Sequence, residues 1–148
     1  MAETVLDNGA RILSERIPGV RSAAVGVWVL HGAAHEPAAL AGVSHLLEHM
    51  VFKGTRKRTA RELAIALEGR GGSLDAYTSR EHTSYQARVL DQDVPLALDV
   101  LADLVLHPLL RSDDLELERE VIMEEIAQVE DTPDDLVFER HGSRFWLD

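Results

Sequence analysis

The segment 42–50, Gly-Val-Ser-His-Leu-Leu-Glu-His-Met, constrains the fold of this chain most strongly. Positions i, i+3 and i+4 of an α-helix lie on one face, so a helix here would project His45, Glu48 and His49 together. Two imidazoles one turn apart can bind a single metal ion, and the neighbouring carboxylate can take a proton from water at that metal. The alternative is a helix whose histidines simply lie at the polar edge of a core.

The chain has no cysteine, which limits the ligands available to a metal. Disulfides and thiolate sites are excluded, so any metal must be bound by His, Asp or Glu. A catalytic zinc site uses three protein ligands and keeps one position open, so we expect an Asp or Glu from elsewhere in the chain. His31, His35 and His82 are weaker alternatives, because loops and strand ends fix ligand geometry less well than one helix face.

Acidic residues are concentrated in the segment 113–139, which carries twelve Asp or Glu and one base, Arg119. This segment accounts for the formal net charge of −11, and the rest of the chain is neutral overall with one basic cluster at residues 53–61. An acidic chain argues against nucleic acid as a partner. We interpret the acidic residues as solvated helix faces, with a negative surface that attracts basic peptides as the functional alternative.

The 148 residues suffice for one domain of ordinary size, and no apolar run approaches the roughly 18–20 residues that a membrane span needs. Residues 1–7 have neither the basic start of a signal peptide nor the Arg-rich character of a transit peptide. We therefore expect a cytoplasmic protein with no membrane partner.

Hydrophobic periodicity predicts an α+β domain with a mainly antiparallel sheet and helices packed on one face. Asn8-Gly9 between two β-prone runs indicates a β-hairpin with a two-residue turn. The nearly continuous apolar run 22–30 predicts a central strand buried on both faces. Thr59 and Glu62 form a capping box that begins a helix. The other expected strands are 73–78 and 82–90. The expected helices are 40–52, 59–68, one capped by Asp91 or Asp93 that runs toward Pro108, 113–130, and one from 133 toward Trp146.

The periodicity of the acidic helix places Glu118 and Glu125 two turns apart along one margin of its apolar stripe. A carboxylate at such a margin is costly to bury unless a cation or a hydrogen-bond donor compensates it. The pair could complete a metal site with the two motif histidines, and salt-bridged boundary carboxylates are the alternative. The stripe itself, which we expect to be buried, consists of Leu115, Ile122, Ile126 and Val129.

Four segments together resemble the zinc peptidase family of pitrilysin, insulin-degrading enzyme and mitochondrial processing peptidase. They are GVSHLLEHMVFKGT at 42–55, GGSLDAYTSREHTSY at 71–85, ELEREVIMEEI at 116–126 and DDLVFER at 134–140. The His-x-x-Glu-His spacing is that of the inverzincins. The chain is most similar to the bacterial processing-peptidase-like members of the family.

The resemblance implies roles for individual residues. In that family the third zinc ligand is a glutamate about 76 residues after the second histidine, and Glu125 is 76 residues after His49. One Zn²⁺ per chain would then be bound by His45, His49 and Glu125. Glu48 would be the general base, and Glu118 would orient a ligand histidine. The implied function is that of a zinc endopeptidase acting on peptides or unfolded segments.

The strand 74–78 resembles the edge strand of that family, onto which a peptide substrate adds as a further β-strand through residues such as Asp75 and Ala76. The family usually has Asn where this chain has Asp75, and an ionised carboxylate accepts hydrogen bonds but does not donate them. We therefore expect substrate hydrogen bonding at this position to differ from that of the family, with basic residues of the substrate favoured. The alternative is a strand-end carboxylate that simply lies in solvent.

Family members are several hundred residues long, so residues 1–148 would be a partial N-terminal catalytic domain. Uncovered sheet edges and core surface favour association, and we expect a homo-oligomer or a complementing domain or subunit as partner. The alternative function is a non-catalytic or complementing fragment that binds metal and acts by assembly.

Overall fold

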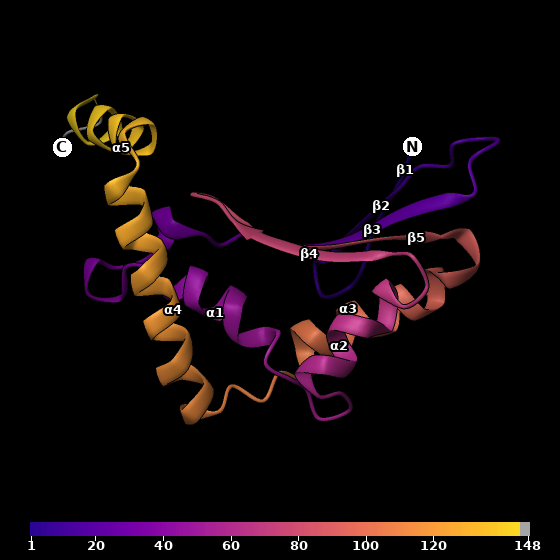
Figure 1. The fold of residues 1–148 in the computed structure, drawn as a ribbon. Helices are drawn as coiled ribbons and strands as arrows, with labels where there is room; N and C mark the ends of the chain where they lie inside the picture. Colours follow the sequence, from indigo (N-terminus) through magenta and orange to yellow (C-terminus); the bar gives the residue numbers. More distant parts are fainter. Residues whose placement is uncertain (146–148) are drawn as a thin grey trace.

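A computed structural model describes residues 1–145, so the predicted course of the last helix toward Trp146 lies outside the described residues. A three-stranded antiparallel sheet of order β3-β5-β4 covers a layer formed by α1, α2 and α3 (Figure 1). The strands are β1 Ala2–Val5, β2 Arg11–Ser14, β3 Ser22–Val29, β4 Ser73–Thr78 and β5 Thr83–Leu90. The helices are α1 Val43–Val51, α2 Ala60–Glu68, α3 Val94–Leu106, α4 Ser112–Asp131 and α5 Pro133–Phe145. The predicted α+β class is confirmed.

The core lies between the helix layer and one face of the sheet. Side chains alternate along a strand, and the central strand β5 turns Tyr85, Ala87 and Val89 toward the helices, where all three are buried. Burying a large apolar side chain contributes about 1.5–3 kcal/mol, so this face supplies the main stabilisation of the domain. The helix residues that complete the core are Val51, Leu63, Leu67, Ala97, Val100, Leu101 and Leu104.

Strand β3 lies at an edge of the described sheet, so the prediction of a central strand is wrong. It pairs with β5, and its outer face is open to solvent. Trp28 lies on that face and remains 53% exposed. Its ring covers Gly26, where a Cβ atom would come within 2.7 Å of the indole. On the outer face of β3, the Trp28 ring therefore packs against Gly26, where the apolar run predicts a second layer of packed side chains.

The N-terminal hairpin forms as predicted, but its turn differs. The N–H of Gly9 donates to the carbonyl of Leu6 at 2.9 Å, and the N–H of Leu6 donates to the carbonyl of Ala10 at 2.8 Å. Among the described residues Gly9 has a positive φ of 84°, whereas Asn8 does not. A two-residue Asn-Gly turn would need a positive φ at both positions. The loop is therefore three residues long, with glycine in its last position.

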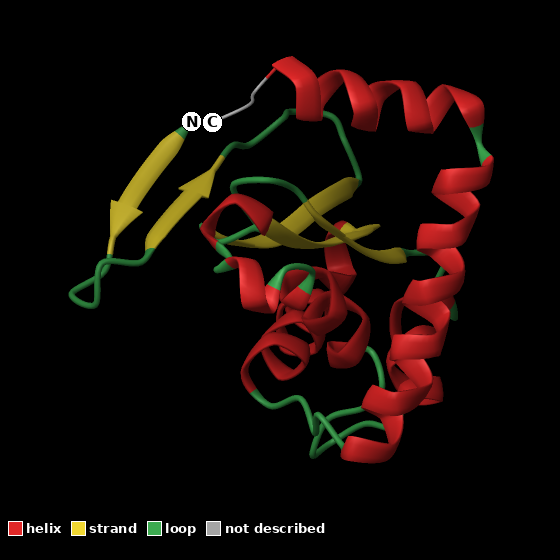
Figure 2. Cartoon of the chain, turned by 90° about the vertical axis from the view of Figure 1, so that its left-hand side faces the viewer, coloured by secondary structure: helices red, strands yellow, loops and turns green. Residues whose placement is uncertain are grey.

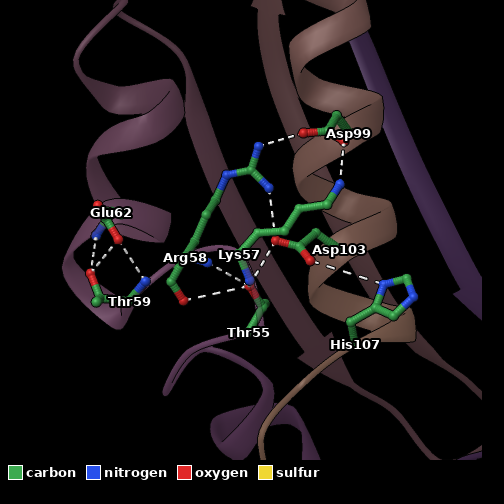
Figure 3. Close-up of polar contacts among 8 residues, drawn as sticks. All are labelled: Thr55, Lys57, Arg58, Thr59, Glu62, Asp99, Asp103 and His107. Carbon is green, nitrogen blue, oxygen red and sulfur yellow. Dashed lines mark hydrogen bonds and ion pairs between the residues drawn. The ribbon is translucent and has the colours of Figure 1, made fainter.

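A polar network fixes the segment 53–59 that joins α1 to α2 (Figure 3). Asp103 on α3 is buried, and its Oδ2 accepts hydrogen bonds from Thr55 Oγ1 and Arg58 Nη1, each at 2.7 Å. Asp99, one turn earlier on α3, forms a second ion pair with Arg58. The connection between the two helices is thereby tied to the core.

Helix α2 begins with the predicted capping box, which Figure 3 also shows. The N–H of Thr59 donates to Glu62 Oε2 at 2.8 Å, and Thr59 Oγ1 accepts the N–H of Glu62 at 3.3 Å. Reciprocal bonds of this kind satisfy N–H groups that a helix leaves without partners at its start. Helix α2 is therefore capped by residues of its own first turn.

Helices α4 and α5 form a bent arm beside the rest of the domain, with α4 packed along α1 and α5 turned across its end (Figure 2). The side of α4 that faces the body centres on Glu118, which is buried. Asp114 and Ile122, one turn to either side, are half-buried, and the other α4 residues are exposed. Within the described chain, no helix is both long and apolar enough to span a membrane.

The predicted burial of the α4 apolar stripe is wrong for three of its four members. Leu115, Ile126 and Val129 retain between 38% and 49% exposure. Periodicity separates the sides of a helix but does not say which side packs. In α4 the side that carries Glu118 packs against the body, because Glu118 contacts the cation of Lys53 and the imidazole of His49.

Candidate metal centre

Helix α1 carries the histidine pair. It begins at Val43 and not at residue 40, because Gly42 adopts a left-handed φ of 91° that ends the preceding irregular segment. The apolar residues Met50 and Val51 anchor the helix in the protein interior. The rings of His45 and His49 then lie side by side, with centroids 4.7 Å apart and planes at 80°.

Glu125 from α4 completes a group of three ligand atoms. Its Oε2 lies 3.6 Å from His45 Nε2 and 3.7 Å from His49 Nε2. The three atoms all lie within 4.8 Å of one another. Packing of α4 against α1 therefore brings together the three residues that the sequence proposes as ligands.

This arrangement fits zinc. Ligands about 2.0–2.1 Å from a tetrahedral Zn²⁺ lie about 3.3 Å apart. The distances from Glu125 to the two histidine nitrogens, 3.6 and 3.7 Å, need to shorten by only a few tenths of an ångström to match this value. Two histidines and one carboxylate are also a known ligand set of catalytic zinc. His45 and Glu125 have side chains that are 42% and 46% exposed, which leaves the site open to a substrate.

Glu48 is a second feature that fits a bound group at this site. It lies between the histidines on α1, and its Oε2 atom is buried without a hydrogen-bond partner in the described structure. A buried carboxylate oxygen without a partner is costly. A hydrogen-bond donor bound next to Glu48 Oε2 would remove the cost of burying this oxygen without a partner. A bound water molecule is one such donor.

Glu118 orients His49 from the side away from Glu125. Its Oε2 lies 3.0 Å from His49 Nδ1, and its Oε1 lies 2.5 Å from Lys53 Nζ. Burial alone would raise the pKa of the Glu118 carboxyl, but Lys53 and His49 together hold that pKa below its ordinary value. An ionised carboxylate can only accept, so Nδ1 of His49 donates to it, and the other ring nitrogen, Nε2, faces Glu125.

Lys53 was not predicted to contact the metal centre, because by sequence it is one of several basic residues in the segment 53–61. It follows His49 by four residues and lies two residues beyond the end of α1. That spacing, combined with a carboxylate expected near His49, is the signal that could have identified it. Lys53 also receives support from Arg111, whose Nη2 donates to its carbonyl oxygen at 2.9 Å.

The three alternative histidines lie outside the group. His31 and His35 stack on each other, and His35 Nδ1 accepts the N–H of Gly32. His82 lies in the turn after β4, with its ring between the side chains of Ser79 and Tyr77 at 3.0 Å each. Each therefore has a local structural role in the described chain.

Beside His45 there is an open cavity of about 510 Å³. It lies next to strand β4, whose outer edge is unpaired in the described sheet. Asp75 and Ala76 are on this strand, in register with Gln86 and Tyr85 of β5. The edge position predicted for the strand is thus present. The cavity is lined by Ala33, Ala34, His45, Thr78, Ser79 and Arg80.

Comparison with known proteins identifies related sequences over nearly the whole chain. The family described as insulinase (peptidase family M16) matches residues 11–147. A protein of Mycobacterium leprae named as an uncharacterized zinc protease is 50% identical over 135 residues, which cover 91% of this chain and 30% of that protein. A probable mitochondrial-processing peptidase subunit beta of Arabidopsis thaliana is 43% identical over 143 residues, which cover 96% of this chain and 27% of that protein.

A solved structure shows the same fold. The crystal structure of a protease from Helicobacter pylori superposes with a TM-score of 0.88 and 25% sequence identity, covering 93% of this chain and 33% of that one. The chain thus spans about a third or less of the length of the proteins it matches.

Proposed function

This chain belongs to the insulinase family of peptidases, family M16, and we propose that it carries the zinc site of an endopeptidase that hydrolyses peptides or unfolded segments. The single observation that carries the proposal is the convergence of His45, His49 and Glu125 from two helices. Residues 1–148 as a partial N-terminal catalytic domain remain a prediction.

In the proposed reaction His45, His49 and Glu125 would hold the metal. A zinc ion bound by them would supply Lewis acidity toward water and toward the carbonyl of the scissile bond. Glu48 takes a proton from the attacking water and delivers it to the leaving amine. Its unpaired, buried oxygen is suited to both steps.

Peptide substrate is proposed to add to the free edge of β4, antiparallel or parallel to Asp75 and Ala76. Backbone hydrogen bonds would align the chain without regard to sequence. The cavity beside His45 would take a side chain close to the scissile bond. Because Asp75 is exposed and acidic, a donor group on the substrate is favoured beside it.

The proposal is tested by zinc content and by cleavage of a quenched peptide. We expect about one zinc per chain after gentle purification and a cleavage rate that Glu48→Gln lowers by at least about 100-fold, the scale of general acid–base catalysis. The variant should keep its zinc, because Glu48 is not among the three ligands. A wild-type chain that binds no zinc would refute the proposal, and equal rates for both proteins would indicate a contaminating protease.

A complementing domain or subunit is the second part of the proposal. Apolar side chains of the arm and the hairpin are strongly exposed, among them Phe138 at 77% and Val5 at 62%. Large exposed apolar surfaces mark interaction sites. If the chain binds zinc but cleaves nothing, and light scattering shows a monomer, the alternative of a metal-binding fragment that acts by assembly is favoured. Cleavage that appears on adding the portion of a relative outside the matched region would then support that alternative.

A further inference from the structure

The N-terminus of α1 is closed by a residue that lies outside the helix. Glu36 Oε2 accepts the N–H of Gly42 at 2.6 Å, and Glu36 Oε1 accepts the N–H of Ser44 at 2.7 Å. The N-cap residue, Gly42, has no side chain that could do this. A helix leaves its first N–H groups without partners, and its dipole favours a negative charge there. Glu36 therefore supplies both the acceptors and the charge.

The segment that carries Glu36 is itself hydrogen-bonded to the turn between β4 and β5. The N–H groups of Ala33 and Ala34 donate to the carbonyls of Ser79 and Arg80, at 3.1 and 2.8 Å. Glu36 follows this short 3₁₀ turn by one residue. Glu36 therefore links the end of β4 to the start of α1. The backbone just before it is bonded to the turn after β4, and its carboxylate is bonded to the first N–H groups of α1.

The two ligand histidines of α1 are supported in different ways. The His49 ring is oriented by Glu118 through Nδ1. For the His45 ring, no hydrogen bond is found within the described residues. Its ring contacts Glu125 and the His49 ring, which are the other two proposed ligands. Apart from these contacts, the placement of His45 depends on the backbone of the first helical turn. Its preceding residue, Ser44, is buried and gives its N–H to Glu36.

We propose that Glu36 is a positioning residue of the metal centre, which holds the first turn of α1 so that His45 meets Glu125 and His49. The inference rests on the proposed function, because it presumes that these three residues bind zinc. Hydrogen bonding with Ser44 also lowers the pKa of the Glu36 carboxyl, which keeps the acceptor ionised at neutral pH.

The chain offers a matched control. Glu62 also accepts a backbone N–H at the start of a nine-residue helix, that of Thr59 at 2.8 Å. Helix α2, however, carries none of the three proposed ligands. Removing either carboxylate costs one helix cap, so a general loss of stability should appear in both variants, whereas an effect on the metal should appear in one.

The experiment compares Glu36→Ala, Glu36→Gln and Glu62→Ala by chelator competition for Zn²⁺, by the visible spectrum of the Co²⁺ form, and by urea unfolding. We expect Glu36→Ala to weaken zinc binding by about 10-fold, the lower end for loss of a group that orients a ligand, and to alter the Co²⁺ spectrum. Glu36→Gln keeps acceptor oxygen and should lie between Glu36→Ala and wild type. Glu62→Ala should match wild-type zinc affinity while its urea midpoint falls as in Glu36→Ala.

Amide hydrogen exchange in the metal-free chain gives a readout that needs no zinc. Exchange at Gly42 and Ser44 should accelerate in Glu36→Ala and stay unchanged in Glu62→Ala. Zinc affinity within about two-fold of wild type in Glu36→Ala, or an equal loss in Glu62→Ala, would overturn the inference while leaving the proposed function intact. A wild-type chain without zinc affinity would overturn both. If Glu36→Ala does not fold, Glu36→Gln decides by the same criteria.

Discussion

Glu118 and Asp103 are both buried carboxylates that contact one Lys or Arg and one further hydrogen-bonding side chain, yet they border different regions of the molecule. Glu118 on α4 meets Lys53 and the ring of His49. That ring has a second nitrogen, which faces Glu125 at 3.7 Å. Burial of Glu118 therefore organises an open site on the surface.

Asp103 on α3 meets Arg58 and Thr55, which lie in the segment between α1 and α2 (Figure 3). Arg58 turns back to Asp99 on the same helix. The other oxygen of Asp103 has no hydrogen-bond partner in the described structure, and the nearest imidazole nitrogen, His107 Nδ1, is 4.0 Å away. The members of this network contact one another, and together they fix the segment 53–59 against α3.

The difference teaches that the first partners of a buried carboxylate do not reveal its role. Both carboxylates compensate their burial with a cation and a donor, as buried charges must. The role depends on where the partner's remaining atoms point. The second ring nitrogen of His49 faces Glu125, a proposed ligand. Thr55 and Arg58 instead contact each other, and Arg58 also pairs with Asp99 on α3.

The largest effect is expected from His45→Ala, which removes a ligand and leaves both buried carboxylates untouched. Zinc affinity should fall by about 1000-fold or more, equivalent to about 4 kcal/mol. The His45 side chain is 42% exposed, so the stability of the metal-free chain should change by less than about 0.5 kcal/mol. Isothermal titration and urea unfolding measure the two quantities. A large loss of stability would mean that the metal region and the core are not separable.

Asp103→Ala should produce the opposite pattern. Removing one partner of a buried pair leaves the others uncompensated, and we expect a loss of about 3 kcal/mol in the free energy of unfolding. Zinc affinity should stay within about three-fold of wild type. Urea unfolding of the metal-free chain measures the loss, with Asp99→Ala as the exposed control that loses less. If zinc binding collapsed as well, the loop network would have to be counted as part of the metal centre.

Glu118→Gln should weaken zinc binding by about 10–100-fold, because it removes the charge that holds the His49 ring. The amide is nearly isosteric, so the fold should persist. Glu124→Gln on the exposed side of α4 is the matched control and should leave zinc affinity unchanged. An unaltered affinity in Glu118→Gln would show that Glu118 is, like Asp103, a structural anchor alone.

The smallest effect concerns pH. Hydrogen bonds from Arg58 and then Lys57 hold the pKa of Asp99 below its ordinary value. A depressed pKa in the folded state contributes stability above the unfolded pKa of about 3.9, and this contribution is lost as the pH falls through the folded value. Unfolding midpoints between pH 5 and 3 should therefore fall more steeply in wild type than in Asp99→Asn. Parallel curves would show that the exposed pair adds nothing to the loop anchor.

Much of the local structure could be predicted because it depends on neighbours in the sequence. The face shared by His45, Glu48 and His49 follows from helix geometry, and the capping box at Thr59 and Glu62 follows from its spacing. The residues alone left Glu118 and Glu125 together as candidates for the third ligand. The family resemblance favoured Glu125, and the structure places Glu125 against both Nε2 atoms and Glu118 against Nδ1.

Other features could not be predicted because they depend on contacts across long stretches of chain. The packing side of α4 is set by Lys53 and His49, and the open face of β3 by the absence of a second layer among the described elements. The cap of α1 comes from Glu36, which precedes Ser44 by eight residues across a turn that the sequence pattern does not define.

The sequence by itself determined which residues can act together on one helix face, because the geometry of a helix is fixed at about 3.6 residues per turn. Tertiary structure decided which carboxylates face those residues and which compensate their burial. The physical reason is that burying a charge is costly unless a partner compensates it. That partner is supplied by another part of the folded chain.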